Sequence, residues 1–451
     1  HLLRRQRQMC IRDRYVSEQR GGLGEKSFTT GHTIPHISLD RVDYFLPPSK
    51  SHMIRMLALA SINDGTTNLL VRGKLGLDIE SMISCLITLG VGIERVSNDD
   101  GLVITVDGVG KNGFTKPNSE VNCGNSGTAL RIILGLVASL NEQVTVSGDD
   151  SLSIRDNNSM LESLSQSGVY TEKISDINLP VTIRGPWFEG QKNMQNISVD
   201  CSKSSQPLTS WMIASALFPC DVKLYPTGKM VSNQHYQLTQ NLCNKFGANI
   251  TNQGEYFSLP KWSPKLDTQL LIPGDASMVG FAILLTKLHN CQTQIYNWPA
   301  SKDTLGNDML QIMSPAMGIK WVGDKIVNDE LSEYAIYDLT DCNDLITPLS
   351  AILAISGGGK INGISHTIYK ESNRIEKTIE VLGCFGLKVK FENNSLLIDG
   401  QQSPNAPTSP VNCYNDHRLY MTAVLLASKF GGDLIGRGLH SVADMDFLQR
   451  L

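Results

Sequence analysis

A helix followed by a glycine and two short strands recurs through this chain of 451 residues. In each copy a segment with apolar residues on one face, such as IESMISCLITLG, runs into a glycine, and two short alternating segments follow. A helix that ends at a left-handed glycine and continues into a strand explains each copy locally. A near-constant period between the glycines predicts duplicated units. The glycines lie 78, 79, 71 and 68 residues apart and are Gly90, Gly168, Gly247, Gly318 and Gly386.

A sixth copy begins at Ala443 with the segment ADMDFLQRL, and no strands follow it in the sequence. We expect the segment HTIPHISLDRVDYF, residues 32–45, to supply those strands from the other end of the chain. A chain of 451 residues also exceeds what one hydrophobic core usually supports. The repeat therefore predicts two domains, one of which is discontinuous in sequence.

A second set of helices lies between the copies and is apolar on nearly every face. Such helices are expected in the core, with the amphipathic helices of the repeat packed outside them. A polar cluster precedes each one, for example SKSHMIR, CGNSGTALR or YNDHR. We expect one buried helix after Lys50 and others over residues 127–140, 207–218, 276–288, 345–356 and 417–428.

The polar clusters indicate a binding site for an anion. Helix N-termini carry unpaired N–H groups and a partial positive charge, so they bind anions readily. Each cluster alone is more often an ordinary helix cap, and a single charge such as Lys50 or Arg374 is more often a solvated one. Their joint occurrence, each at the same structural place, favours a shared cavity for a small molecule with several negative charges.

Composition excludes several other classes of protein. The sequence has no stretch of about 18 apolar residues, as a membrane span requires, and its ten cysteines are scattered without a C-x-x-C pair. We therefore expect a soluble cytoplasmic protein with reduced thiols and no metal site. Residues 1–20 hold six arginines and a net charge of +4, which leaves −8 for the remainder. We expect residues 1–24 to be disordered or foreign to the native protein, and the acidic body argues against nucleic acid as a partner.

Eight motifs in series resemble the enolpyruvyl transferase family of 5-enolpyruvylshikimate-3-phosphate synthases, also called 3-phosphoshikimate 1-carboxyvinyltransferases. The similarity covers about residues 30–450, and the motifs are PPSKSHMIR, GNSGTALR, GDDSLSIR, SSQPLTS, GDAS, DLITPL, YKESNR and NDHR. The resemblance implies an α/β fold of two domains, each with three βαβαββ repeats and buried helices, an inside-out α/β barrel. It further implies one lobe of residues 48–272 and a discontinuous lobe of residues 25–47 and 273–451.

The resemblance also implies a reaction. In this family the enolpyruvyl group of phosphoenolpyruvate is transferred to the 5-hydroxyl of shikimate 3-phosphate, with release of phosphate. The reaction belongs to the shikimate pathway of aromatic amino acid biosynthesis. By this resemblance the partners are the two small-molecule substrates, and no metal or organic cofactor takes part. We expect neither nucleic acid nor a membrane as a partner, and we expect a monomer.

The same motifs imply site residues. By resemblance, Lys50 touches both substrates, while Ser51 and Arg55 hold the shikimate carboxylate, which suits charged donors at a helix start. The shikimate 3-phosphate site also includes Ser204, Ser205, Gln206, Ser232, Asp344 and Lys370. The phosphoenolpyruvate site consists of Lys50, Asn125, Gly127, Arg155, Gln206, Arg374 and Arg418.

Asp344 and Glu371 match the catalytic carboxylates of the family, with Lys50 as a third catalytic group. One group must remove the proton of the 5-hydroxyl, and one must protonate the methylene carbon of phosphoenolpyruvate. Carboxylates among many cations should have low pKa values unless they are buried. An acid role for Glu371 therefore requires local desolvation, which closure of the two domains would supply.

Five positions depart from the pattern of the family. The family usually has glycine at position 48, proline at 156, tyrosine at 235, asparagine at 366 and lysine at 442. This chain has Pro48, Asp156, His235, His366 and Val442 instead. Asp156 would place a negative charge beside Arg155. The missing lysine at position 442 predicts weak binding of phosphoenolpyruvate, with Arg437 as the nearest basic substitute.

Two alternative functions stay open. The sister enolpyruvyl transferase that acts on UDP-N-acetylglucosamine shares the fold, but it uses a reactive cysteine and lacks the S-K-S-x-x-x-R clamp. Here Cys123 lies close to the GNSGT motif, where we interpret it as structural. The second alternative is a catalytically weak paralogue that binds shikimate phosphate without turnover, which the residues at 48, 156 and 442 would explain.

Overall fold

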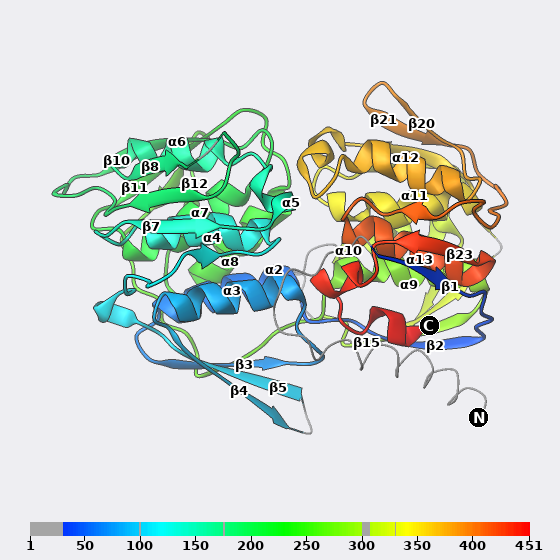
Figure 1. Cartoon of the computed structure of the whole chain (residues 1–451), viewed down its shortest axis with the longest axis horizontal. Coiled ribbons are helices and arrows are strands. Elements are labelled where there is room, and N and C mark those ends of the chain that lie inside the picture. Colours follow the sequence, from blue (N-terminus) through cyan, green and yellow to red (C-terminus); the bar gives the residue numbers. More distant parts are fainter. Residues whose placement is uncertain (1–29, 99–100, 175, 300–306, 330) are drawn as a thin grey trace.

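Two lobes lie side by side in the structure, a computed structural model that describes residues 30–98, 101–174, 176–299, 307–329 and 331–451 (Figure 1). The buried apolar residues form two separate clusters. One cluster spans residues 53–272, and the other combines residues 42–46 with residues 278–447. On this basis we propose residues 48–272 as the first lobe and the flanking segments as the second. The basic leader, residues 1–24, lies outside the described residues.

The interior helices of both lobes are buried on nearly all faces, as the sequence predicts. In α13, every residue from His417 to Ser428 is buried. Because apolar side chains point in all directions, such a helix has no face that favours water. These helices are α2 (Lys50–Ile62), α4 (Gly127–Val137), α7 (Gln206–Ala214), α9 (Val279–His289), α11 (Ile346–Ile355) and α13 (His417–Phe430).

The amphipathic helices bury one face and expose the other. Each is followed by a repeat glycine and a pair of antiparallel strands, and the five glycines have φ between +68° and +105°. Only glycine adopts this left-handed backbone at little cost, so these positions decide where each helix ends. The helices are α3 (Leu77–Thr88), α6 (Asn158–Gln166), α8 (Asn233–Lys245), α10 (Asn307–Met313) and α12 (Arg374–Cys384).

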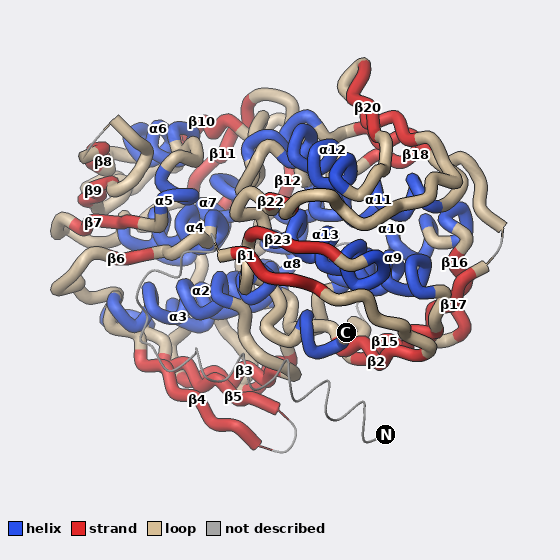
Figure 2. The backbone as a smooth tube through the Cα atoms, turned by 45° about the vertical axis from the view of Figure 1, so that its right-hand side comes forward, coloured by secondary structure: helices blue, strands red, loops and turns tan. Residues whose placement is uncertain are grey.

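Strands lie mainly along the periphery of each lobe, around the helices (Figure 2). In the first lobe the sheet orders are β14-β3-β5-β4, β6-β7-β9-β8 and β10-β11-β13-β12. The first pair of each sheet is parallel and the others are antiparallel, as a βαβαββ unit requires. The strands are β3 (Thr66–Val71), β4 (Gly92–Asn98), β5 (Gly101–Asp107), β6 (Val121–Asn122), β7 (Val144–Ser147), β8 (Tyr170–Lys173), β9 (Val181–Arg184), β10 (Gln195–Asp200), β11 (Val222–Thr227), β12 (Thr251–Asn252), β13 (Phe257–Leu259) and β14 (Gln269–Leu271).

The second lobe repeats this pattern in β2-β15-β17-β16 and β18-β19-β21-β20. Its third sheet, β22-β23-β1, has three strands within the described part of the chain. The strands are β1 (Gly31–Ile34), β2 (Arg41–Phe45), β15 (Gln292–Tyr296), β16 (Ile319–Val322), β17 (Lys325–Asn328), β18 (Ala335–Asp338), β19 (Gly359–Asn362), β20 (Val389–Glu392), β21 (Ser395–Ile398), β22 (Val411–Asn412) and β23 (Gly432–Ile435).

The N-terminal strands complete the second lobe in a way that the sequence predicts only in part. β1 pairs antiparallel with β23 and so joins the sixth unit, as expected. β2 instead pairs parallel with β15, with Arg41 opposite Gln292. The reason is that β2 leads directly into the crossing between the lobes, which lies at the start of the α9 unit. The segment after Ala443 forms a 3-10 turn over Phe447–Arg450 rather than an amphipathic α-helix.

The two crossing segments run antiparallel to each other. The N–H of Ser49 donates to the carbonyl oxygen of Pro273, and the N–H of Asp275 donates to that of Pro47, both at 2.8 Å. Pro48 lies between them as one half of an isolated bridge, and neither of these hydrogen bonds needs its missing N–H. The crossing therefore accommodates a proline at residue 48 and brings the chain to the start of α2.

Candidate active site

Lys50 is the first residue of α2, directly after the crossing. Ser49 caps this helix by accepting a hydrogen bond from a backbone N–H of the first turn. The Nζ atom of Lys50 lies 2.8 Å from Oδ2 of Asp78 on α3. Burial lowers the pKa of Lys50, but Asp78 and Glu371 outweigh burial and raise it. Lys50 is therefore an ammonium group close to carboxylates of both lobes.

Arg55 lies on the same helix and is 1% exposed. Its Nε donates to Oγ1 of Thr239 at 2.8 Å, its Nη2 to the carbonyl of His235 at 3.1 Å, and its Nη1 to the carbonyl of Ser51 at 2.9 Å. Burial lowers the pKa of Arg55 to about 10, because no carboxylate in the described part of the chain pairs with it. A buried cation without a counter-ion is costly, so this position favours an anionic ligand.

The loop Asn125–Gly127 is held against two arginines. Arg155 donates from Nη2 to Oδ1 of Asn125 at 2.6 Å and from Nη1 to its carbonyl at 3.3 Å. Arg131 donates from Nη1 to the carbonyl of Gly127 at 3.1 Å. A Cβ atom at Gly127 would lie 2.7 Å from that Nη1 and 3.4 Å from Nη1 of Arg155. A side chain at Gly127 would therefore crowd both guanidinium groups.

Asp156 points away from Arg155. Its Oδ2 lies 2.5 Å from Nζ of Lys203, and its Oδ1 accepts from the N–H of Asn158 at 2.9 Å. Burial raises the pKa of Asp156, but the hydrogen bond from Lys203 outweighs burial and lowers it. The carboxylate is therefore engaged by Lys203, and it does not pair with the arginine beside it in sequence.

The three serines assigned by resemblance to the shikimate 3-phosphate site differ in their hydrogen bonds. Ser204 accepts from the N–H of Gln206 at 3.2 Å, at the start of α7. Gln206 donates from Nε2 to the hydroxyl of Thr128 at 3.1 Å. Ser205 is 1% exposed, and its hydroxyl donates to the carbonyl oxygen of Ser232 at 2.9 Å. The hydroxyl of Ser205 thus holds the backbone of Ser232, the residue directly before α8.

Asp344 precedes α11 and receives hydrogen bonds from two arginines. Arg374 donates from Nη1 to Oδ1 at 2.8 Å, and Arg418 donates from Nη2 to Oδ2 at 3.2 Å. Burial raises the pKa of Asp344, but Arg418 and Arg374 hold it well below its ordinary value. Asp344 is therefore an ionised carboxylate that can accept a proton.

Glu371 lies on the opposite side of the same guanidinium group. Nη2 of Arg374 donates to Oε2 of Glu371 at 2.5 Å, and Nδ1 of His417 lies 4.0 Å from Oε1. Burial raises the pKa of Glu371, but Arg374 and Arg155 hold it well below its ordinary value. Burial alone does not make Glu371 an acid here, so it must gain a proton before it can donate one.

Lys370 and two histidines lie beside the carboxylates. Burial lowers the pKa of Lys370, and the charge of Asp344 opposes this shift. The pKa of His235 is lowered to about 3 by burial and then by Lys370, and that of His366 to about 4 by the same two causes. Both histidines that replace other residues of the family pattern are therefore neutral at pH 7.

Cations from both lobes surround the two carboxylates. The charges of Arg374, Arg155 and Lys50 lower the pKa of Glu371 despite its burial. Those of Arg418 and Arg374 do the same for Asp344. Arg55 donates to the carbonyl of His235, and the charge of Asp344 acts on the same histidine. Because lysine and arginine of the first lobe meet carboxylates of the second, the site lies between the lobes.

Sequence reasoning missed several groups that the fold brings to this site. Asp416 is fully buried and accepts from Nε of Arg374 at 2.8 Å. Its place in the NDHR motif is a signal that could have identified it, and the arginine of GNSGTALR likewise identifies Arg131. No local motif marks Asp78, the partner of Lys50, because the two meet only through the packing of α2 against α3.

Val442 and Arg437, the two residues considered for the missing lysine, have different surroundings. Val442 is 5% exposed in a 3-10 turn, and its carbonyl oxygen lies 2.7 Å from the position of a Cβ atom on Gly76 in the first lobe. Arg437 lies against β1: its N–H donates to the carbonyl of Thr30 at 3.3 Å. Burial and then the charge of Arg437 lower the pKa of His32 to about 4. Arg437 therefore sits beside His32 on β1.

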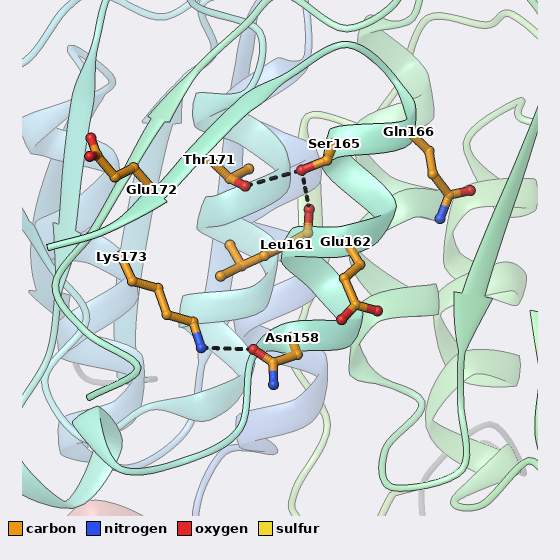
Figure 3. Close-up of a pocket in the computed structure, with 8 residues that line it drawn as sticks. All are labelled: Asn158, Leu161, Glu162, Ser165, Gln166, Thr171, Glu172 and Lys173. Carbon is orange, nitrogen blue, oxygen red and sulfur yellow. Dashed lines mark hydrogen bonds between the residues drawn. The ribbon is translucent and has the colours of Figure 1, made fainter. Parts of the chain in front are cut away.

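We also searched the described residues for a metal site, a membrane-spanning helix and other grooves. They contain no group of three or more His, Cys, Asp or Glu side chains that could hold a metal ion. Throughout the described ranges, no helix is long and apolar enough to cross a bilayer. A groove between α6 and β8 is lined by the buried Leu161, by exposed residues such as Glu162 and Lys173, and by none of the predicted site residues (Figure 3).

The fold is that of the enolpyruvyl transferases. An EPSP synthase from Acinetobacter baumannii superposes with a TM-score of 0.70 at 19% identity, over 93% of this chain and 97% of that one. The enolpyruvyl transferase NikO from Streptomyces tendae superposes with a TM-score of 0.68 at 15% identity, over 93% and 96% of the two chains. The two-domain α/β architecture expected from the sequence is confirmed.

The chain belongs to the EPSP synthase (3-phosphoshikimate 1-carboxyvinyltransferase) family, whose profile matches residues 44–442. The 3-phosphoshikimate 1-carboxyvinyltransferase of Clostridium kluyveri is 27% identical over 404 residues, which cover 88% of this chain and 90% of that protein. The protein of the same name from Methanobrevibacter smithii is 26% identical over 435 residues, with 90% and 94% covered. Family membership thus agrees with the motifs in the sequence.

Proposed function

We propose that this protein transfers the enolpyruvyl group of phosphoenolpyruvate to the 5-hydroxyl of shikimate 3-phosphate and releases phosphate. Family membership supports this reaction. The observation that carries it is the pair of ionised carboxylates, Asp344 and Glu371, held by cations of both lobes. Such a site suits two anionic substrates that react while the carboxylates move a proton.

Shikimate 3-phosphate is proposed to bind mainly to the first lobe. Its carboxylate would give the buried guanidinium group of Arg55 the anionic partner that the described residues do not provide. Its phosphate would lie at the starts of α7 and α8, where Ser204 and Ser232 offer hydroxyl groups. Helix N-termini favour a phosphate for the same electrostatic reason at both places.

Phosphoenolpyruvate is proposed to bind between Arg155, Arg374 and Arg418. The Nε atom of Arg155 is buried and lacks a hydrogen-bond partner among the described residues, and so does that of Arg418. Arg374 already donates to Asp344 and Glu371, so a substrate carboxylate at this guanidinium group would share or replace those bonds. Replacement would leave the two catalytic carboxylates better able to accept a proton.

The chemistry proceeds in two steps, and each of them moves protons. In the first step a carboxylate takes the proton of the 5-hydroxyl, the hydroxyl oxygen bonds to C2 of phosphoenolpyruvate, and C3 gains a proton. In the second step the bond between C2 and the phosphate oxygen breaks, C3 loses a proton, and phosphate leaves. Asp344 and Glu371 are the groups for accepting protons, and the ammonium group of Lys50 is a donor within the same site.

One chain supplies every residue of this site, so we propose that the monomer is the active unit. A coupled assay of phosphate release with both substrates tests the function. Steady release with shikimate 3-phosphate is expected; release with UDP-N-acetylglucosamine instead would identify the sister activity. Binding of shikimate 3-phosphate in calorimetry without any release would identify the weak paralogue. Size-exclusion chromatography with light scattering tests the monomer.

A further inference from the structure

The start of α8 is bonded to the other lobe through its backbone. The N–H of Ser232 donates to the carbonyl oxygen of Thr340 at 3.1 Å. The next N–H, of Asn233, donates to Oδ1 of Asp341 at 2.6 Å. Two consecutive backbone donors at the N-terminus of a first-lobe helix therefore bind one short loop of the second lobe.

A side chain of the same loop binds the hydroxyl of Ser232. Nδ2 of Asn343 donates to Oγ of Ser232 at 2.8 Å, and Asn343 is 0% exposed. The other side-chain atom, Oδ1 of Asn343, has no partner among the described residues although it is buried. Asn343 directly precedes Asp344, the candidate base. The loop thus connects a serine of the phosphate site to a catalytic carboxylate of the opposite lobe.

The hydrogen bond from Asn343 influences whether the hydroxyl of Ser232 acts as a donor or as an acceptor toward a ligand. An amide NH₂ group only donates, whereas a hydroxyl has one proton and two acceptor lone pairs. When Asn343 occupies one lone pair, the proton of the Ser232 hydroxyl remains available for donation to another group. No acceptor for that proton is recorded among the described residues, so the hydroxyl is set to donate to a ligand.

The backbone of Ser232 is held in place as well. Its φ is +56°, in the left-handed region that residues other than glycine seldom adopt. Such a conformation persists only when its surroundings hold it. The hydroxyl of Ser205 donates to the carbonyl of Ser232 at 2.9 Å, and Thr340 accepts its N–H at 3.1 Å. With Asn343 on the hydroxyl, the carbonyl, N–H and side chain of Ser232 are all engaged.

We propose that Asn343 is a positioning residue that makes the Ser232 hydroxyl a donor to the phosphate of shikimate 3-phosphate. Because Asn343 comes from the second lobe, this contact also couples binding of that substrate in the first lobe to the placement of Asp344. The inference rests on the proposed function, since it names the substrate of the same site.

A double-mutant cycle tests this inference, with the dissociation constant of shikimate 3-phosphate measured by calorimetry without phosphoenolpyruvate. The variants are Asn343→Ala, Ser232→Ala and the pair combined. We expect each single variant to weaken binding about tenfold, as for one lost hydrogen bond to a charged group. We expect the double variant to bind no more weakly than the weaker single one, because Asn343 acts through the Ser232 hydroxyl. Single losses that multiply to about a hundredfold would overturn the inference.

Controls separate positioning from general destabilisation. Asn343→Leu fills the buried volume without a donor, and it should weaken binding as Asn343→Ala does. Asn68→Ala removes an acceptor of Thr105 in an outer sheet and should leave the dissociation constant unchanged. Asn343→Ala should raise KM for shikimate 3-phosphate and leave KM for phosphoenolpyruvate within about twofold. An equal rise in both KM values would overturn the inference.

The outcome for the unmodified protein separates the two proposals. If it does not bind shikimate 3-phosphate, the proposed function fails and this inference fails with it. If it binds and turns over the substrate but Asn343→Ala binds equally well, only the role of Asn343 fails.

Discussion

Arg374 donates from Nε to Oδ2 of Asp416 at 2.8 Å, and the two side chains are 1% and 0% exposed. Arg374 begins α12, and Asp416 caps α13 by accepting from the N–H of Arg418 at 2.9 Å. This buried ion pair therefore joins the starts of two helices. It also directs the outer nitrogens of Arg374 toward Asp344 and Glu371. The position of both candidate catalytic carboxylates thus depends on Asp416, which is assigned no contact with either substrate in the proposed reaction.

Replacement of either carboxylate should slow the chemical step. We expect Asp344→Asn and Glu371→Gln each to lower kcat by about a hundredfold or more, because each removes a proton acceptor while keeping the side-chain shape. Phosphate release with both substrates measures kcat. The exposed Asp399→Asn serves as the matched control and should retain full activity. Full turnover by Asp344→Asn would show that Asp344 is not the base.

Loss of the buried cation on α2 should affect one substrate. Arg55→Met keeps an unbranched buried side chain but removes the charge that we assign to the shikimate carboxylate. KM for shikimate 3-phosphate should rise about 10- to 100-fold, and KM for phosphoenolpyruvate should stay unchanged. Arg41→Met, at a position with a largely exposed side chain, is the control. An unchanged KM for shikimate 3-phosphate would contradict the assignment.

A methyl group at residue 127 should affect the other substrate. In Gly127→Ala the new Cβ would lie 2.7 Å from Nη1 of Arg131, so that guanidinium group must shift beside the proposed phosphoenolpyruvate site. We expect KM for phosphoenolpyruvate to rise by about tenfold, with little change for shikimate 3-phosphate. Gly383→Ala on α12 is the control, because its Cβ meets no atom within 4 Å. Equal changes in both KM values would contradict the placement of the loop.

A lysine at residue 442 tests whether its absence weakens phosphoenolpyruvate binding. Val442→Lys restores the residue type of the family at a turn that packs against the first lobe. One charge-assisted hydrogen bond is worth about 1.5–3 kcal/mol, so KM for phosphoenolpyruvate should fall about tenfold or more. Steady-state kinetics at saturating shikimate 3-phosphate measure it. A higher KM together with a lower Tm would mean that the buried site rejects the charge.

Buried histidines should make stability depend on pH below neutrality. Burial lowers the pKa of His440 to about 3, well below the ordinary value of 6.5. Between these two values the unfolded chain binds the proton and the folded chain does not, so stability falls as the pH drops below about 6.5. For one such histidine, the free energy of unfolding decreases by about 1.4 kcal/mol per pH unit. The lowered pKa of His32, about 4, adds to the effect with the same sign.

The variant His440→Phe isolates this effect. Phenylalanine keeps an aromatic ring beside Tyr420 and Phe447 and cannot titrate. Thermal unfolding of both proteins between pH 7 and pH 4.5 is the measurement, and Tm of His440→Phe should fall less steeply with acidification. Parallel curves for the two proteins would show that His440 does not contribute.

Most of the fold could be predicted from the sequence because its signals are local. The change from helix to strand at Gly90 or Gly386 depends on a left-handed residue within the same few positions. Whether a helix is interior or exterior follows from the faces that carry apolar side chains, as in α13 and α12. The partner of a strand is less local, and β2 pairs with β15 because of where the chain must cross between the lobes.

The sequence by itself determined the repeat, the interior helices and the family, since these depend on residue type and spacing along the chain. Only the tertiary structure decided which charges meet. Arg374 binds Asp416, Asp344 and Glu371, which are 42, 30 and 3 residues away in sequence, and Asn343 binds Ser232 over 111 residues. The physical reason is that hydrogen bonds and ion pairs depend on distance in space, and packing of the two lobes sets that distance.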